Sequence, residues 1–285
     1  MQIVLLGTGS PVLDPAREHS ALIVRLQGDF RLGEQTLLFD AGRGVTTSLA
    51  RLGDPPQTLG AIFITHHHYD HIGGLGELLL TAWNNGRETR LDVFGPQGTA
   101  AIVAALFDQV FARDLAFAMR TDPAAVDIHE VVRVTEVAPG QVITGPGWSA
   151  RAEQVEHGHA LGISQAEFPC LGYRLEAQGK AVAISGDTVA CDGLDRLARG
   201  ADVLVQCCYL AEAELTTPAR RRMAEAVLAS SGAVGRIAAR NGVGRLVLTH
   251  FRPKSAELMD SLLADARRDF PGEVILGEDR MVVEL

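Results

Sequence analysis

The sequence predicts an α/β protein in which β-sheets lie inside and helices lie outside. Two observations predict this class. Short apolar runs rich in Val, Ile and Leu recur from end to end of the 285-residue chain, as β-strands do in a large core. Stretches with helical periodicity lie between them, and the alternation of strand-rich and helical segments occurs twice, which indicates two similar halves. Because no linker separates the halves, we expect one domain over residues 1–285.

Strands are expected where a short run of branched or aromatic residues is bounded by turn residues. In the first half these runs are residues 2–6, 21–26, 36–39, 61–65, 91–94 and 131–137. In the second half they are residues 149–156, 171–176, 181–185, 202–206, 245–249 and 281–285.

Helices are expected where apolar residues recur every three or four positions. These segments are residues 45–52, 75–83, 97–113, 218–229, 234–240 and 255–269. Proline and glycine punctuate residues 123–130 and 139–147 without an apolar period, so both are predicted to be surface loops.

Several predicted strands are followed at once by a polar or metal-binding residue. The strands that do this end at Phe39, Thr65, Glu156, Ser185, Gln206 and Thr249. We therefore expect these strand ends to converge on one rim of the protein and to form a site there.

Charge and cysteine content restrict the partners and the compartment. The chain has 35 acidic and 26 basic residues, a formal net charge of −9, which disfavours binding to nucleic acid or to an anionic membrane. It has no apolar run long enough to span a bilayer and no basic secretory start. The four cysteines form no CxxC pair and suit a reducing compartment, so a cytoplasmic protein is expected.

A histidine-rich motif directly after the strand at residues 61–65 carries the chemistry. Residues 65–71 read THHHYDH, which contains His-x-His-x-Asp-His. Neutral imidazole and carboxylate suit zinc and other first-row divalent ions, and this many ligands in one loop can serve two adjacent ions. The alternative is a solvated His-rich surface loop with incidental metal affinity. The following Gly73 and Gly74 favour the metal site, because they allow the tight backbone that it needs.

With this motif the chain resembles the metallo-β-lactamase superfamily. Within it, the chain is similar to the branch of ribonuclease Z and the arylsulfatase-like and cyclic-phosphodiesterase-like hydrolases. Besides the His-rich loop, the motifs that carry the resemblance are LGTGSP (6–11), FDAGRG (39–44), VEH (155–157), LGYRL (171–175), SGDT (185–188) and LTH (248–250). The resemblance implies a four-layer αββα sandwich with two metal ions at the rim.

The resemblance also implies which residues bind the ions. The implied ligands are His66, His68 and His157 for the first ion, Asp70, His71 and His250 for the second, and Asp187 as a bridge. His159 is an alternative to His157. Asp40 is implied to orient the His-rich loop, and it also fits an N-cap of the next helix. Zinc is the usual metal, and manganese or iron would fit the same ligands.

The implied reaction is hydrolysis by a hydroxide that bridges the two ions. Asp70, Asp187 and Asp40 are the expected catalytic residues, and His19 and His159 are expected to contact the substrate. The expected substrate is a small phosphodiester or sulfate ester. The alternatives are a lactone, thioester or β-lactam hydrolase, a tRNA 3′-processing endonuclease and a non-catalytic, metal-dependent ligand sensor.

Two departures argue against RNA as the substrate. Ribonuclease Z has His-Glu-Ala-Thr where residues 206–209 here read Gln-Cys-Cys-Tyr, and glutamine cannot transfer a proton. The long basic arm with which that family grips tRNA is also absent. We therefore expect a small-molecule ester as the partner, with no nucleic acid and no membrane, and a homodimer is the habit of the family.

Overall fold

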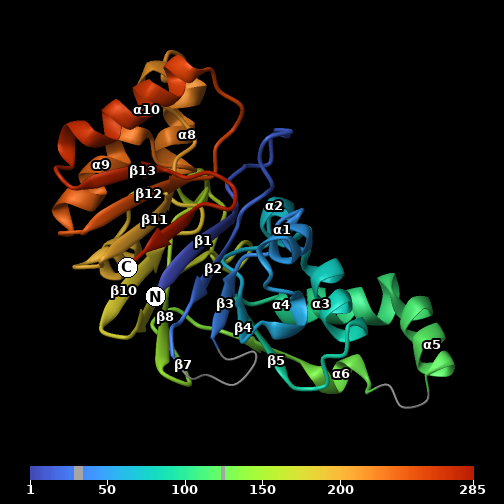
Figure 1. The fold of residues 1–285 in the computed structure, drawn as a ribbon. Helices are drawn as coiled ribbons and strands as arrows, with labels where there is room; N and C mark the ends of the chain where they lie inside the picture. The colour runs from blue at the N-terminus through green and yellow to red at the C-terminus, as the bar shows by residue number, and fades with distance from the viewer. Residues whose placement is uncertain (29–34, 123–125) are drawn as a thin grey trace.

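The computed structural model describes residues 1–28, 35–122 and 126–285, whose strands form two seven-stranded sheets packed face to face (Figure 1). The first sheet has the spatial order β14 (Val282–Glu284), β1 (Gln2–Gly7), β2 (Ala21–Arg25), β3 (Thr36–Phe39), β4 (Ala61–Phe63), β5 (Leu91–Gly95) and β6 (Val132–Glu136). The second has the order β13 (Glu273–Leu276), β12 (Arg245–Thr249), β11 (Val203–Cys207), β10 (Lys180–Ile184), β9 (Leu171–Ala177), β8 (Trp148–Gln154) and β7 (Val142–Gly145).

Each sheet is antiparallel in one part and parallel in the other. Strands β1 to β3 alternate in direction, whereas β3 to β6 run parallel. Strands β7 to β10 form an antiparallel meander, and β10 to β13 run parallel. Because parallel strands end at the same edge of a sheet, the segments after β3, β4, β10 and β12 gather at one rim.

Helices cover the outer face of each sheet, which completes the predicted four-layer αββα sandwich (Figure 1). Over the first sheet lie α1 (Val45–Leu52), α2 (Tyr69–Ile72), α3 (Leu75–Asn84), α4 (Thr99–Ala105), α5 (Ala112–Thr121) and α6 (Ile128–Val131). Over the second lie α7 (Asp192–Ala198), α8 (Pro218–Ala226), α9 (Ser231–Arg240) and α10 (Ala256–Asp269). In α1, Val45 and Leu49 are buried four residues apart, and Gly53 ends the helix with a φ of 76°, a conformation that favours glycine.

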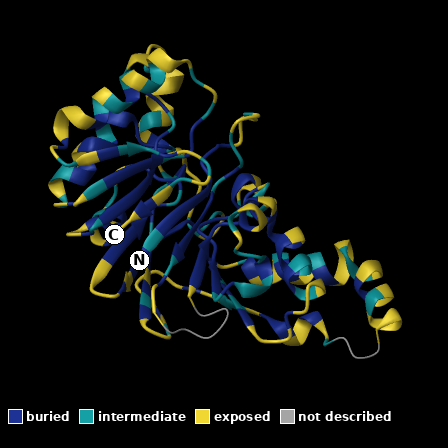
Figure 2. Cartoon of the chain, viewed as in Figure 1, coloured by how far each residue is buried: buried dark blue, intermediate teal, exposed yellow. Residues whose placement is uncertain are grey.

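The central core lies between the two sheets, and it is buried throughout (Figure 2). Phe39 and Phe63 stack with ring centres 4.8 Å apart, and Tyr173 of the second sheet packs edge-on against Phe63 at 5.4 Å. The Tyr173 hydroxyl donates a hydrogen bond of 2.8 Å to the carbonyl of Ile64, in the segment after β4. The aromatic contacts and this bond tie the two sheets together directly below the rim.

The structure differs from the predicted elements in several places. Residues 139–147 do not form only a loop, because β7 lies there and pairs with β8 through Ile143 and Ala150. The predicted helix at 97–113 is three pieces, in which the π-helical turn Leu106–Val110 separates α4 from α5. The edge strand β13 and the helix α7 were not predicted. The predicted loop at 123–130 ends within α6, and its residues 123–125 lie outside the described residues.

Among the helices of the described ranges, none has the length and apolar character that crossing a membrane requires.

Candidate metal centre

Four side chains converge at the rim from three segments of the chain. His66 and His68 follow β4, His157 follows β8, and Asp187 follows β10. Their ligand atoms all lie within 4.8 Å of one another. The Nε2 atoms of His66 and His157 lie 3.1 and 3.2 Å from Nδ1 of His68. Three imidazole nitrogens that face one another this closely are a set of ligands suited to one divalent ion.

A second group lies beside the first and consists of Asp70, His71 and His250. Nε2 of His250 is 3.1 Å from Oδ2 of Asp70, and Nε2 of His71 is 3.7 Å from the same oxygen. Asp187 lies between the groups, with Oδ1 at 3.5 Å from His71 Nε2 and Oδ2 at 3.3 Å from His250 Nε2. Its Oδ2 also lies 3.7 Å from His157 Nε2, so this carboxylate faces both groups.

In several of these rings one nitrogen is hydrogen-bonded to another protein group, and this decides which nitrogen is left to bind a metal. Nδ1 of His157 donates to the carbonyl of Val227 at 2.7 Å, and Nδ1 of His71 donates to Oδ2 of Asp40 at 2.7 Å. Nδ1 of His66 lies 3.0 Å from the Thr65 hydroxyl, which itself donates to Asp40. With a proton held on Nδ1 of these rings, Nε2 is the nitrogen that faces the centre and can bind a cation.

The donor set fits two divalent cations. Nε2 of His71 and Oδ1 of Asp187 are buried without a hydrogen-bond partner, which is costly unless a cation satisfies them. Burial, reinforced by the neighbouring His71, holds the pKa of His66 well below its usual value. Burial by itself would raise the pKa of Asp187, but His250 and His71 outweigh it and hold that pKa well below its usual range. The neutral ring and the ionised carboxylate are the forms that bind a metal.

Asp40 supports the His-rich loop from below. Its carboxylate accepts from the Thr65 backbone N–H at 2.8 Å, the Thr65 hydroxyl at 2.9 Å and the His71 ring at 2.7 Å. It does not cap the following helix, because the N-cap residue of α1 is Gly44. Asp40 and His250 both have a positive φ, 59° and 65°. Such a backbone is strained for a non-glycine residue and is typical of functional sites.

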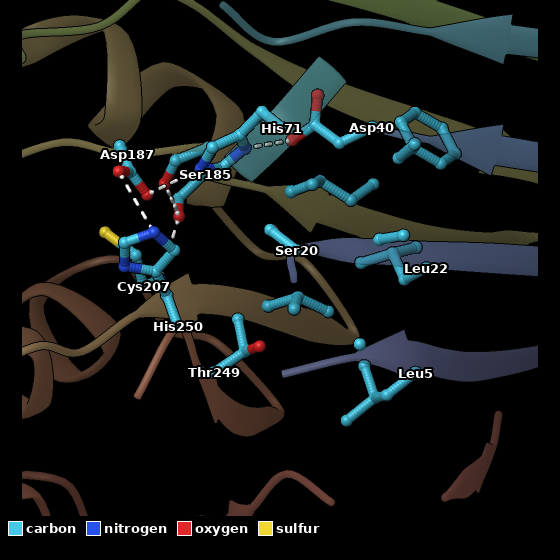
Figure 3. Close-up of a pocket in the computed structure, with 16 residues that line it drawn as sticks. Leu5, Ser20, Leu22, Asp40, His71, Ser185, Asp187, Cys207, Thr249 and His250 are labelled. Atoms are coloured by element: carbon cyan, nitrogen blue, oxygen red, sulfur yellow. Dashed lines mark hydrogen bonds and ion pairs between the residues drawn. The ribbon is translucent and has the colours of Figure 1, made fainter. Parts of the chain in front are cut away.

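A cavity of about 20 Å³, room for one water molecule, lies under the ligands between the two sheets. In Figure 3, Asp187, His71 and His250 meet at one end of this cavity, and Asp40 reaches His71 from behind. Cys207 borders the same end beside His250. Burial, and next the charge of Asp187, raises the pKa of the Cys207 thiol well above its usual value, so the thiol stays protonated and is a poor nucleophile.

The structure separates the two histidines between which the sequence left a choice. His157 brings its ring into the first group. His159 instead accepts from the backbone N–H of His157 through Nδ1 at 2.9 Å and donates from Nε2 to the carbonyl of Phe168 at 3.0 Å. Its ring therefore holds the loop that carries His157 and takes no place in the ligand groups.

His19 lies near the second ligand group. It is 5% exposed, and neither ring nitrogen has a hydrogen-bond partner. Its ring packs edge-on against Tyr69, with ring centres 5.7 Å apart. Burial and the nearby Arg43 lower its pKa, so the ring is neutral. A buried imidazole without a partner has one nitrogen free to donate and one free to accept.

The other predicted features lie outside the ligand groups. His67 bonds the hydroxyl of Thr99 at 2.9 Å, and His129 is exposed between two aspartates. Gln206 is fully buried at the end of β11, where its amide nitrogen contacts the carbonyl and the sulfur of Cys207. The β9–β10 hairpin closes through Gln178 and Gly179, so no arm is inserted there.

Sequence reasoning missed two contacts that shape the centre. The ring of Phe168 lies 4.6 Å from the ring of His68 and 5.9 Å from that of His66, and it forms an apolar wall beside the first group. The carbonyl of Val227, just past α8, orients His157. Neither residue type carries a signal of its own, because any apolar residue of the right shape and any backbone carbonyl would serve.

Comparison with known proteins assigns these features to a family. Residues 35–251 match the beta-lactamase superfamily domain. The ribonuclease Z of Mycolicibacterium paratuberculosis is 36% identical over 284 residues, which cover 98% of this chain and 96% of that protein. The ribonuclease Z of Mycobacterium bovis is 32% identical over 302 residues, with coverages of 100% and 98%.

Solved structures show the same fold. Human tRNase Z, short form (ELAC1), has a TM-score of 0.71 at 23% identity and covers 100% of this chain and 99% of its own. The metallo-beta-lactamase fold protein YhfI from Bacillus subtilis has a TM-score of 0.72 at 21% identity, with coverages of 99% and 98%.

The expectation of a small-molecule ester partner and no nucleic acid is wrong, because relatives that match nearly the full chain are named ribonuclease Z. It relied on the net charge of −9, which sums the whole chain and says nothing of where charges lie. That sum also counts Asp40, Asp70 and Asp187, which are buried in or against the ligand groups and are opposed there by any bound cations.

Proposed function

Because this chain belongs to the beta-lactamase superfamily of metal-dependent hydrolases, in its ribonuclease Z-like branch, we propose that it is an endonuclease that processes the 3′ ends of tRNA precursors. The observation that carries the proposal is the pair of ligand groups that share Asp187, buried except for His68, at the rim of a chain that aligns with ribonuclease Z over nearly its whole length. The four cysteines are free thiols, which is in keeping with action in the cytoplasm.

We assign zinc to the centre, since the imidazole and carboxylate ligands of the two adjacent groups suit it. The proposed ligands are His66, His68 and His157 for one ion, Asp70, His71 and His250 for the other, and Asp187 for both. When bound, two such ions supply an activated water and neutralise the charge that develops on a phosphate.

The side chains around the ions perform the remaining tasks. Burial by itself would raise the pKa of Asp70, but a hydrogen bond from His250 and the charges of His71 and His250 together outweigh it and lower that pKa. Asp70 and Asp187 are therefore ionised, which is the form of a carboxylate that can hold a cation. Asp40 keeps the proton of His71 on Nδ1, and His159 holds the backbone of His157 in place.

His19 is our candidate for contact with the substrate. Gln206 is buried and cannot give a proton to the leaving oxygen, so a donor must come from elsewhere. The unpartnered ring of His19 lies on the side of the second group and offers a free N–H. A hydrogen bond from this ring to the RNA would satisfy a nitrogen that is otherwise buried at a cost.

The test is cleavage of a tRNA precursor with a 3′ trailer by the zinc-loaded full chain. We expect one cut at the 3′ end of the mature tRNA, which a chelator stops and added zinc restores. Asp187→Asn is expected to lower kcat at least 100-fold, because it removes a charge that both ligand groups share. Asp127→Asn, an exposed carboxylate outside the groups, is the matched control and should cleave like the parent. No cleavage by the zinc-loaded parent chain would refute the proposal.

A further inference from the structure

A second cluster of charged side chains lies beside His250, outside the metal ligands. Its centre is the carboxylate of Glu214, which is 4% exposed. Arg252 and Lys254 donate to its two oxygens, and the backbone N–H of Ala211 donates to one of them at 2.9 Å. Arg252 follows His250 by two residues, so the cluster is continuous in the chain with the second ligand group.

Positive charge exceeds negative charge in this cluster. One carboxylate faces the cations of Arg252 and Lys254, and Arg220 donates to the backbone carbonyl of Glu214 at 3.2 Å. Burial, followed by the charges of Arg252 and Arg220, lowers the pKa of Lys254 to about 8, which leaves the ammonium mostly protonated at neutral pH. The cluster is therefore a local positive region in a chain whose net charge is negative.

Arg252 has donor capacity that the protein does not use. Its Nε is buried and has no hydrogen-bond partner. Its guanidinium lies over the ring of Tyr209, 5.9 Å from the ring centre, and that ring is 6.1 Å from the ring of His250. Tyr209 thus packs near both Arg252 and His250, a member of the second ligand group. The side chain of Arg252 is 26% exposed, so an anion can reach the part of the guanidinium that Glu214 does not hold, while Nε itself stays buried.

We propose that Arg252, oriented by Tyr209 and Glu214, binds an RNA phosphodiester group next to the one that is cleaved. This inference rests on the proposed function. An RNA strand held at the ligand groups carries its neighbouring phosphates past this side, and the part of the guanidinium that Glu214 does not hold can donate a charged hydrogen bond to one of them. Lys254 occupies the second oxygen of Glu214, so this carboxylate is shared and does not neutralise Arg252 alone.

The same cluster accounts for how this chain holds RNA without an arm. The turn at Gln178 and Gly179 leaves no room for inserted basic residues between β9 and β10. Cations within the fold, next to the site of cleavage, take over part of that task. Salt screens the charge of these cations beyond a short distance. For RNA binding, their position beside the second ligand group therefore matters more than the net charge of the whole chain.

The test compares Arg252→Gln, Arg252→Lys and Arg245→Gln in the zinc-loaded full chain. Arg245 is the matched control, because it begins β12, the strand that ends next to His250, and pairs with Glu273 at the opposite edge of the sheet. The probe is mature, fluorescently labelled tRNA, which the enzyme cannot shorten further. Its affinity is measured by anisotropy over a range of KCl concentrations, and cleavage of the precursor is measured in parallel.

We expect Arg252→Gln to weaken tRNA binding roughly 10-fold, the size of one lost hydrogen-bonded charge contact, and to reduce the slope of log affinity against log salt by about one. Arg252→Lys should keep the slope and recover part of the affinity, and Arg245→Gln should bind like the parent. Equal affinity and slope for Arg252→Gln and the parent would overturn this inference and leave the proposed function intact if the parent cleaves. A parent that neither binds tRNA nor cleaves the precursor would overturn both.

Discussion

Asp40→Asn isolates the part that one hydrogen bond plays in metal binding. Asparagine has the same shape as aspartate and tolerates the φ of 59° found at this position, so the backbone need not change. Its oxygen can still accept from the Thr65 N–H. Its NH₂ group, however, replaces the oxygen that now accepts from the Thr65 hydroxyl and from Nδ1 of His71.

The two donors that lose this oxygen respond differently. The Thr65 hydroxyl can rotate and accept from the new NH₂ group. The His71 ring can accept only if its proton moves from Nδ1 to Nε2, the atom that lies 3.5 Å from Asp187 and faces the second ligand group. This change of tautomer removes a ligand. We expect the affinity for the second ion to fall about 10- to 100-fold, and the metal-free protein to lose about 1.5–3 kcal/mol with its charged hydrogen bonds.

Zinc affinity is measured by competition with a chromophoric chelator, and stability by urea unfolding of the chelator-treated protein. The first ion should bind as in the parent, because His66 and His157 keep their hydrogen-bond partners. Asp202→Asn is the control, since Asp202 accepts from Lys180 and the Ala181 N–H near the start of β11, the end opposite the rim. If Asp40→Asn binds two zinc ions with parental affinity, the tautomer argument is wrong.

Three further changes test the site and the core. His68→Gln should lose zinc and activity, whereas His67→Gln, one residue away but bonded to a threonine, should keep both; equal zinc content in the two variants would contradict the assigned ligands. The metal-free protein should lose stability as the pH falls below about 6.5. Burial lowers the pKa of His66 in the folded state, so below that pH the unfolded chain binds more protons than the folded one. Urea unfolding midpoints measured between pH 7.5 and 5.5 check this prediction, and midpoints that do not change with pH would refute it. Tyr173→Phe should cost about 1–3 kcal/mol, since it leaves the buried carbonyl of Ile64 without its donor; a urea midpoint equal to that of the parent would show that this bond contributes nothing.

Two strained residues at the rim connect stability with function. Asp40 and His250 are two of the four non-glycine residues with positive φ in the described part of the chain. Each such conformation costs about 1–3 kcal/mol. Both residues directly follow a strand and turn their side chains into or under the ligand groups. Binding of cations to the converging ligands offsets this strain, so we expect the metal to stabilise the fold as well as to act in the reaction.

Local sequence was sufficient for the elements that positioned the site. The strands at 36–39 and 245–249 and the helix at 45–52 have the predicted bounds, because an apolar run that ends at a polar residue or a glycine shows where an element stops. The His-rich loop could be read as metal-binding for the same reason, since its donors are neighbours in the chain. The short strand β7 could not be predicted from the sequence. Glycine and proline flank its four residues, and only pairing with β8 makes it a strand.

The sequence by itself determined the fold class, the residue types at the rim and the chemistry that they suit. Tertiary structure decided which of His157 and His159 enters the ligand groups, because two residues so close in the chain differ only in where their rings point. It also placed Arg252 over Tyr209 and beside His250, a positive region that the net charge concealed. Periodicity and motifs report neighbours along the chain, whereas a site depends on distances between residues that are far apart in it.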